Sequence, residues 1–116
     1  MPRLHYCDTN YNLEPPLDIN PLILQLYEGE DLLVICARKG MEIRINHLLE
    51  TDEMYSKCRV KVKGIWIEDT VATFTRGYLT MFKGIVIVGK TRIYEDYLSI
   101  LTFIESVCRP TNHIEV

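Results

Sequence analysis

The sequence predicts a small, mainly β domain: a barrel of five to six strands with an irregular N-terminal arm and at most one or two short helices. Short apolar or alternating segments follow one another from residue 32 to residue 107, separated by turns, as in small barrels and sandwiches. Within one of these segments Gly64 reverses which positions are apolar, which indicates a bent strand that serves two sheets. The predicted organisation is an arm over 1–20, a single β domain over 21–110 and a polar tail over 111–116.

The first 20 residues contain prolines and turn-forming Asn and Asp residues, which favour an irregular arm. Asn20-Pro21 has the pattern of a helix N-cap followed by the first helical residue. This pattern predicts a short helix over 22–27. A strand over 23–26 is the open alternative, because so short an apolar run fits both structures.

The middle of the chain predicts strands. Residues 32–37 form a compact apolar run, followed by a predicted turn over 38–40. Residues 41–46 alternate between apolar and polar side chains, which is the two-residue period of a strand. Residues 48–55 are acidic, and they fit either a helical turn or a loop.

The last third of the chain predicts further strands. Residues 71–80 are rich in β-branched and aromatic side chains, which favours a strand. Residues 85–88 are apolar at every position, as expected for a central strand that is buried on both faces. Residues 97–107 are interpreted as the final strand.

The most distinctive pattern is a row of cations. Lys57, Arg59, Lys61 and Lys63 occupy alternate positions, so a strand would direct all of them to one face. An acidic protein or a phosphate backbone would complement this face. The alternative is a solvated edge strand whose lysines discourage aggregation. A barrel can bring further cations and aromatic side chains close to the row, and aromatic rings can stack on bases. The predicted nucleic-acid or partner-binding residues are therefore Lys57, Arg59, Lys61, Lys63, Lys90, Arg92, Tyr94 and Tyr97.

No residue cluster in the sequence indicates catalysis, a metal or a cofactor. The four cysteines are far apart, and none forms a C-x-x-C pair. Residues 84–91 match the G-x-x-x-x-G-K-S/T pattern of a phosphate-binding loop. The four residues between the glycines are Ile-Val-Ile-Val, which favours a strand whose amides are committed to a ladder. The sequence thus predicts a protein that is not an enzyme, with no catalytic residues, no metal and no cofactor.

Charge and targeting patterns indicate the compartment. The net charge of −3 combines −6 over residues 1–56 with +3 over residues 57–116, so a local basic surface is compatible with an acidic chain. No signal peptide and no apolar run of membrane-spanning length is found in the sequence. With free thiols, these features predict an intracellular protein of the nucleus or cytoplasm that does not enter a membrane.

Two segments carry a family resemblance. Val60–Glu68 looks like a first strand bent at glycine, and Gly84–Tyr94 looks like a late strand followed by a glycine and a basic residue. Together with 98–107 they resemble oligonucleotide/oligosaccharide-binding (OB) folds of the replication protein A and telomere-capping type. The acidic turn and the helix of that family are not recognisable here.

The resemblance implies a non-enzymatic subunit of a nuclear nucleoprotein complex, at telomeres or on single-stranded DNA. It implies a hetero-complex with another protein subunit and possible contact with single-stranded DNA. The alternative from a different class is a compact viral or regulatory accessory protein that binds host protein only. A small enzyme whose site the sequence does not reveal is the third hypothesis.

Overall fold

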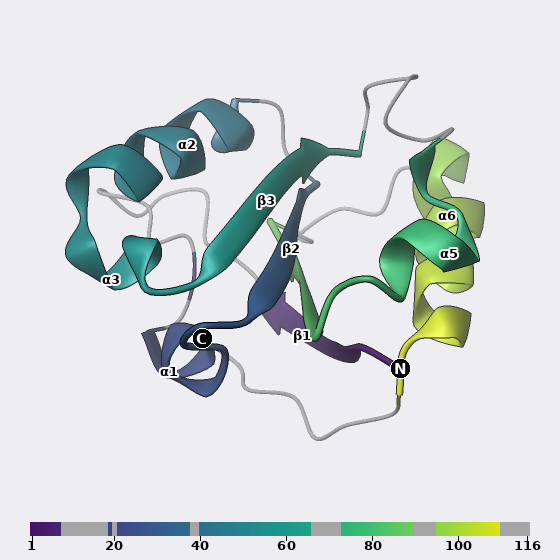
Figure 1. Cartoon of the computed structure of the whole chain (residues 1–116). Helices are drawn as coiled ribbons and strands as arrows, with labels where there is room; N and C mark the ends of the chain where they lie inside the picture. Colours follow the sequence, from purple (N-terminus) through teal and green to yellow (C-terminus); the bar gives the residue numbers. More distant parts are fainter. Residues whose placement is uncertain (8–18, 20, 38–39, 66–72, 90–94, 110–116) are drawn as a thin grey trace.

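The chain folds around an open sheet in which all four described strands are parallel. The computed structural model describes residues 1–7, 19, 21–37, 40–65, 73–89 and 95–109. The strand order is β1-β4-β2-β3 (Figure 1). The predicted five- to six-stranded barrel is therefore wrong. The described elements are β1 (Arg3–Cys7), α1 (Pro21–Leu26), β2 (Asp31–Cys36), α2 (Met41–Thr51), α3 (Glu53–Ser56), β3 (Arg59–Gly64), α5 (Arg76–Leu79), β4 (Gly84–Val88) and α6 (Glu95–Val107).

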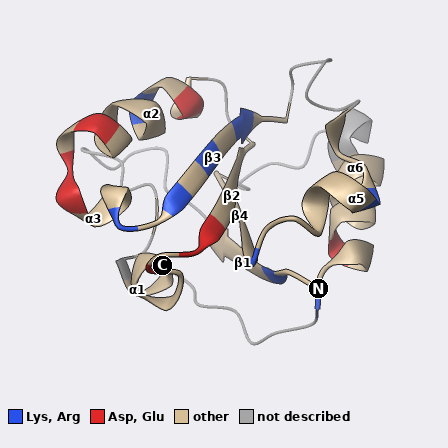
Figure 2. Ribbon diagram, viewed as in Figure 1, with Lys and Arg blue, Asp and Glu red and all other residues tan. Residues whose placement is uncertain are grey.

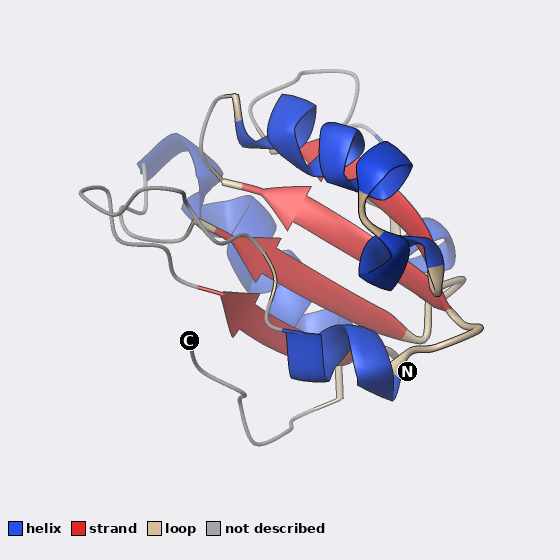
Figure 3. Cartoon of the chain, turned by 90° about the vertical axis from the view of Figure 1, so that its left-hand side faces the viewer, coloured by secondary structure: helices blue, strands red, loops and turns tan. Residues whose placement is uncertain are grey.

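Helices cover both faces of the sheet (Figure 3). Helices α1, α2 and α3 pack on one face, which we call the α2 face, and α5 and α6 pack on the other, the α6 face. The connections β1–α1–β2 and β2–α2–β3 advance in one direction on the α2 face. The connection from β3 through α5 returns to β4 on the α6 face. All three crossovers therefore share one hand, as the rule for parallel strands requires.

The core lies where β2 and β4 run side by side. Every residue of β4 is buried, and so is every residue of β2 after Asp31. The prediction of a strand over 32–37 and of a central strand over 85–88 is confirmed. A strand buried on both faces has no polar face, which explains why these two segments are continuous apolar runs.

The alternating segment 41–46 belongs to a helix, so its predicted strand is wrong. It begins α2, in which Met41 and Ile45 are buried whereas Ile43 is 71% exposed. Met41 and Ile45 are one helical turn apart and lie on the same side of the helix. The alternation arises because Ile43 is an exposed apolar residue, which is common on protein surfaces.

The predicted final strand over 97–107 is also wrong, because this segment lies in α6. Among the described side chains of α6 the buried ones are Leu101, Ile104 and Val107, which recur every three residues and form one helical stripe. Phe103 is 36% exposed. Within the predicted strand 71–80 the structure instead places α5, at residues 76–79. Parallel strands need long crossovers, and these segments supply the helices.

The predicted irregular arm over 1–20 contains a strand, β1, that lies in register with β4. Leu4 and Cys7 are buried on opposite faces, so this end of the chain is part of the fold. The short helix predicted over 22–27 is confirmed as α1, at residues 21–26. Gly64 is the buried last residue of β3, paired with Cys36, and Ile65 lies in a turn, so the predicted bend within a continuous strand at Gly64 is wrong. The predicted tail over 111–116 lies outside the described residues.

Candidate binding surface

Three of the predicted cations stand in a row on β3. In the parallel register Arg59 lies beside Asp31, Lys61 beside Leu33 and Lys63 beside Ile35. Leu33 and Ile35 point into the core of the α6 face, so the cations project from that same face of the sheet. We call Arg59, Lys61 and Lys63 the basic row. Neighbouring members are about 6.6 Å apart along the strand, because a parallel strand rises about 3.3 Å per residue.

The basic row is accessible because β3 is the last strand of the described sheet. Arg59 and Lys61 are exposed and Lys63 is half-buried. Among the described elements, α5 and α6 lie over the other strands, and none crosses β3 on the side that faces the viewer in Figure 1. Figure 2 shows the basic residues as blue segments along β3. The row therefore forms an open surface on a rigid element.

Arg59 is partly neutralised within the chain. Its guanidinium donates to the Asp31 carboxylate from Nε at 2.9 Å and from the terminal nitrogen at 3.3 Å. This hydrogen bond holds the pKa of the Asp31 carboxyl below its ordinary value, and the nearby Lys83 charge acts in the same direction. The two side chains are 65% and 45% exposed, so water screens the pair and its contribution to stability is small. The pair fixes the first cation of the row in place.

Lys61 and Lys63 carry the uncompensated charge of the row. Within the part of the chain that the structure describes, no ion pair is recorded for either ammonium group. The helices on the opposite face of β3 are acidic, and Figure 2 shows their Asp and Glu residues as red segments of the ribbon along α2 and α3. The acidic side chains of these two helices and the residue between them are Glu42, Glu50, Asp52 and Glu53. The edge at β3 is thus basic on the α6 face and acidic on the α2 face.

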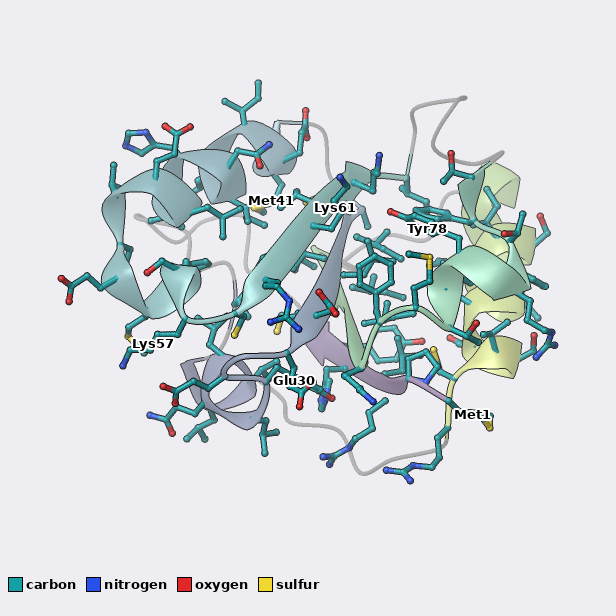
Figure 4. All side chains as sticks on the ribbon, viewed as in Figure 1. Met1, Glu30, Met41, Lys57, Lys61 and Tyr78 are labelled. Atoms are coloured by element: carbon teal, nitrogen blue, oxygen red, sulfur yellow. The ribbon has the colours of Figure 1, made fainter. Side chains whose placement is uncertain are left out.

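The fourth cation of the predicted row lies elsewhere. Lys57 is the C-cap of α3 and precedes β3, so the two-residue period of the strand does not include it. In Figure 4 Lys57 projects beside α3, well away from Lys61. The prediction that all four cations share one strand face therefore holds for three of them.

The remaining predicted site residues are Lys90, Arg92, Tyr94 and Tyr97. Lys90, Arg92 and Tyr94 lie outside the described residues. Tyr97 lies in the first turns of α6, on the helix that covers the α6 face, and not on a strand. The Asp31 contact of Arg59 was not predicted. It depends on the register between β2 and β3, which the sequence pattern alone does not reveal.

The carboxyl ends of β2 and β4 form the place where open α/β sheets commonly bind ligands. The two strands are neighbours, and the helices that follow them, α2 and α6, pack on opposite faces. Gly40 and Gly89, close to these ends, both have positive φ angles, of 87° and 82°. Among the described charged residues at this edge, Glu42 lies in the first turn of α2 and Lys63 lies beside Ile35 near the end of β3. The thiols of Cys7 and Cys36, the last residues of β1 and β2, also lie at this edge, and both are buried in the core of the α2 face.

The phosphate-loop pattern at 84–91 does not form a phosphate loop over its first five residues. Gly84–Val88 is the central strand β4, whose backbone pairs with both β1 and β2. A phosphate loop requires free amides between a strand and a helix. Gly84 is needed for packing instead, because a Cβ atom there would lie 2.6 Å from Cε1 of Tyr27.

The most conspicuous titratable pair of the interior is structural. The Nε2 atom of His5 and the hydroxyl of Tyr27 form a hydrogen bond of 2.6 Å between β1 and the residue that follows α1. The two side chains are 0% and 4% exposed, so a substrate cannot reach them. Burial raises the pKa of Tyr27, and the charges of Arg3 and Arg109 oppose this shift. The hydrogen bond gives a partner to two buried polar groups, the Nε2 atom of His5 and the hydroxyl of Tyr27, and it ties β1 to the α2 face.

Comparisons with protein-family models, with curated proteins and with solved structures found no match to the chain. In the described residues no group of His, Cys, Asp or Glu side chains is placed to hold a metal ion. No described helix is long and apolar enough to cross a membrane. The basic row is therefore the feature of this surface on which a function can be argued.

Proposed function

We propose that this chain is a non-catalytic binding module that holds an acidic partner protein through the basic row on β3. The observation that carries the proposal is the position of Lys61 and Lys63 on the open edge strand, without an ion-pair partner among the described residues. Like charges on neighbouring positions of one face repel, and an anionic surface against them removes this cost. The row lies on a strand of the core sheet, so its spacing is fixed before binding.

A partner protein is favoured over single-stranded nucleic acid. Arg59 is already paired with Asp31, which leaves two uncompensated cations in the row. Two phosphate contacts supply little affinity at physiological salt. The acidic helices α2 and α3 on the other face of β3, and the net charge of −3, repel a long polyanion. We propose no nuclear location and no telomeric role, because both rested on the likeness to a barrel.

The experiment compares three forms of the full chain: the wild type, Lys61→Glu/Lys63→Glu, and the control Lys57→Glu/Arg76→Glu. The control makes the same change of net charge at exposed positions outside the row. The probes are a fluorescent peptide rich in glutamate and an oligothymidine of matched length, each titrated at 50 and 200 mM salt. Urea unfolding of each variant establishes that it is folded.

The proposal predicts that the glutamate-rich peptide binds the wild type and the control equally. Reversal of the row should weaken this binding about tenfold or more, because attraction is replaced by repulsion at two sites. Oligothymidine should bind more weakly than the peptide. If oligothymidine binds more tightly, with a log–log salt slope of about −1.4 for two phosphates, the row is a nucleic-acid surface and the proposal of a protein partner is wrong. Equal peptide affinity of all three forms would also refute the proposal.

A further inference from the structure

The outer edge of β3 carries backbone groups that are directed away from the sheet. The amide of Arg59 donates to the carbonyl of Glu30 at 2.9 Å, and the amide of Ile65 donates to the carbonyl of Cys36 at 3.0 Å. In a parallel ladder, alternate residues direct both their N–H and C=O groups to the same neighbour. Residues 59, 61, 63 and 65 thus face β2, and the backbone groups of Val60 and Val62 face outward.

This outer edge is unpaired in the described part of the chain. The strand β3 pairs with β2 alone, and no hydrogen bond is recorded for the amides or carbonyls of Val60 and Val62. An unpaired row of this kind is a template for the addition of another strand. Binding modules that use such an edge derive affinity from backbone hydrogen bonds and specificity from alternate side chains.

We propose that the acidic partner contributes an extended segment that adds to β3 as a fifth strand; this inference rests on the proposed function of the basic row. The segment forms hydrogen bonds with the outward backbone groups of Val60 and Val62. Its carboxylates lie on the α6 face opposite Lys61 and Lys63, where directly opposed charges of opposite sign attract.

The two-residue side-chain period of β3 and of the added strand determines the sequence pattern that the partner must have. Side chains on one face of an added strand recur every two residues, as the members of the basic row do. An acidic residue at every second position therefore places one carboxylate opposite each lysine. The residues between them point to the α2 face, where Val60 and Val62 are partly buried against the core. Alternating acidic and apolar residues are thus the pattern that fits this edge.

The same charges discriminate against a second copy of the chain. Two β3 edges paired with each other would bring Lys61 and Lys63 of one copy against the basic row of the other. Opposed like charges on paired strands are destabilising, and natural edge strands use lysine to prevent such association. The edge therefore rejects its own copy and accepts an acidic strand, which gives specificity through repulsion as well as attraction.

The test uses the full chain and nine-residue peptides built from glutamate and valine. In the first peptide the two residues alternate, and in the second the same residues are arranged in blocks of two. Two further peptides keep the alternating order but carry N-methyl groups either on the valines or on the glutamates. N-methylation removes the amide donor from the probe and leaves the protein unchanged, so folding of a variant does not affect the result.

The alternating peptide should bind about tenfold more tightly than the block peptide, because only alternation places the carboxylates opposite the row while the backbones pair. One of the two N-methylated peptides should lose at least tenfold in affinity and the other should bind normally. An antiparallel addition requires the valine amides and a parallel addition the glutamate amides, so this result also gives the strand direction. Amide exchange at Val60 and Val62 should slow by about tenfold on binding, since both backbones then become paired.

The outcomes separate this inference from the proposed function. If the alternating and block peptides bind equally, and Lys61→Glu/Lys63→Glu weakens both alike, the row binds acidic partners but strand addition is wrong. If both N-methylated peptides bind as well as the parent, strand addition is again wrong. If no glutamate peptide binds at low salt, the proposed function itself fails.

Discussion

Replacement of Gly84 by alanine tests the packing between β4 and the segment after α1. An ideal Cβ atom on Gly84 would lie 2.6 Å from Cε1 and 2.8 Å from the hydroxyl oxygen of Tyr27. Carbon atoms pack at about 3.5–4.0 Å, so the ring must move by about 1 Å. The ring is held by its hydrogen bond to His5 and by their edge-to-face contact, with centroids 5.5 Å apart.

We expect Gly84→Ala to lower the free energy of unfolding by about 2–4 kcal/mol. Overpacking costs about 1–3 kcal/mol, and loss of the buried bond to His5 adds about 1–3 kcal/mol. Restriction of the unfolded chain by alanine offsets about 0.4–1 kcal/mol. The assay is urea unfolding, which gives the free energy of unfolding of each variant directly.

Two controls complete this experiment. Gly77→Ala adds a methyl group with no atom within 4 Å, in the helix α5, so it should be neutral or stabilise by up to about 1 kcal/mol. Tyr27→Leu removes the obstructing ring, and with Gly84→Ala it should show a coupling of at least about 1 kcal/mol. A Gly84→Ala variant within about 0.5 kcal/mol of the wild type, or full additivity with Tyr27→Leu, would refute this packing.

Three further outcomes are expected. Ile45→Ala on the buried side of α2 should cost about 2–5 kcal/mol, whereas Ile43→Ala on its exposed side should stay within about 0.5 kcal/mol; equal effects in urea unfolding would contradict the orientation of α2. Burial raises the pKa of the Cys108 thiol from 9.0 to about 11, so the unfolded chain loses this proton at a lower pH than the folded chain. The free energy of unfolding should therefore decline between about pH 9 and pH 11, and it should decline less steeply in Cys108→Ala. Parallel pH profiles of the wild type and Cys108→Ala would contradict the shift. All four thiols are buried, so a thiol reagent should react with the native chain only at the rate of opening, and fast reaction of any thiol in buffer would contradict its placement.

The two central strands and the first helix were predicted from the sequence because their patterns fit one structure best. The apolar runs at β2 and β4 are continuous since both faces of each strand are buried, and Asn20-Pro21 correctly indicated the start of α1. The prediction of a barrel was wrong because the sequences of α2 and α6 resemble those of strands. In α2 the exposed Ile43 completes a false alternation, and in α6 the apolar stripe runs through β-branched and aromatic residues that favour strands. Short amphipathic segments do not distinguish the two structures unless the tertiary partners are known.

The candidate site was predicted in part. Strand periodicity placed Arg59, Lys61 and Lys63 on one face, and the structure shows the same arrangement. The pattern extended the row to Lys57 because alternation continues past the point where the strand begins. An edge strand was predicted only as the alternative, and the outward groups of Val60 were not predicted, since a closed barrel has no free edge. Which strand lies at the edge is decided by the order β1-β4-β2-β3, and no local pattern encodes that order.

The central claim, that the basic row holds an acidic partner protein, is tested most directly by capture from an extract of the cells that make the protein. The wild type, Lys61→Glu/Lys63→Glu and Lys57→Glu/Arg76→Glu are each immobilised, and the retained proteins are quantified by mass spectrometry at 50 and 200 mM salt. The account predicts a protein with an alternating acidic and apolar segment that is retained by the wild type and the control, is lost from the row variant, and is released by the higher salt. Retention of the same proteins in the same amounts by all three forms would contradict it.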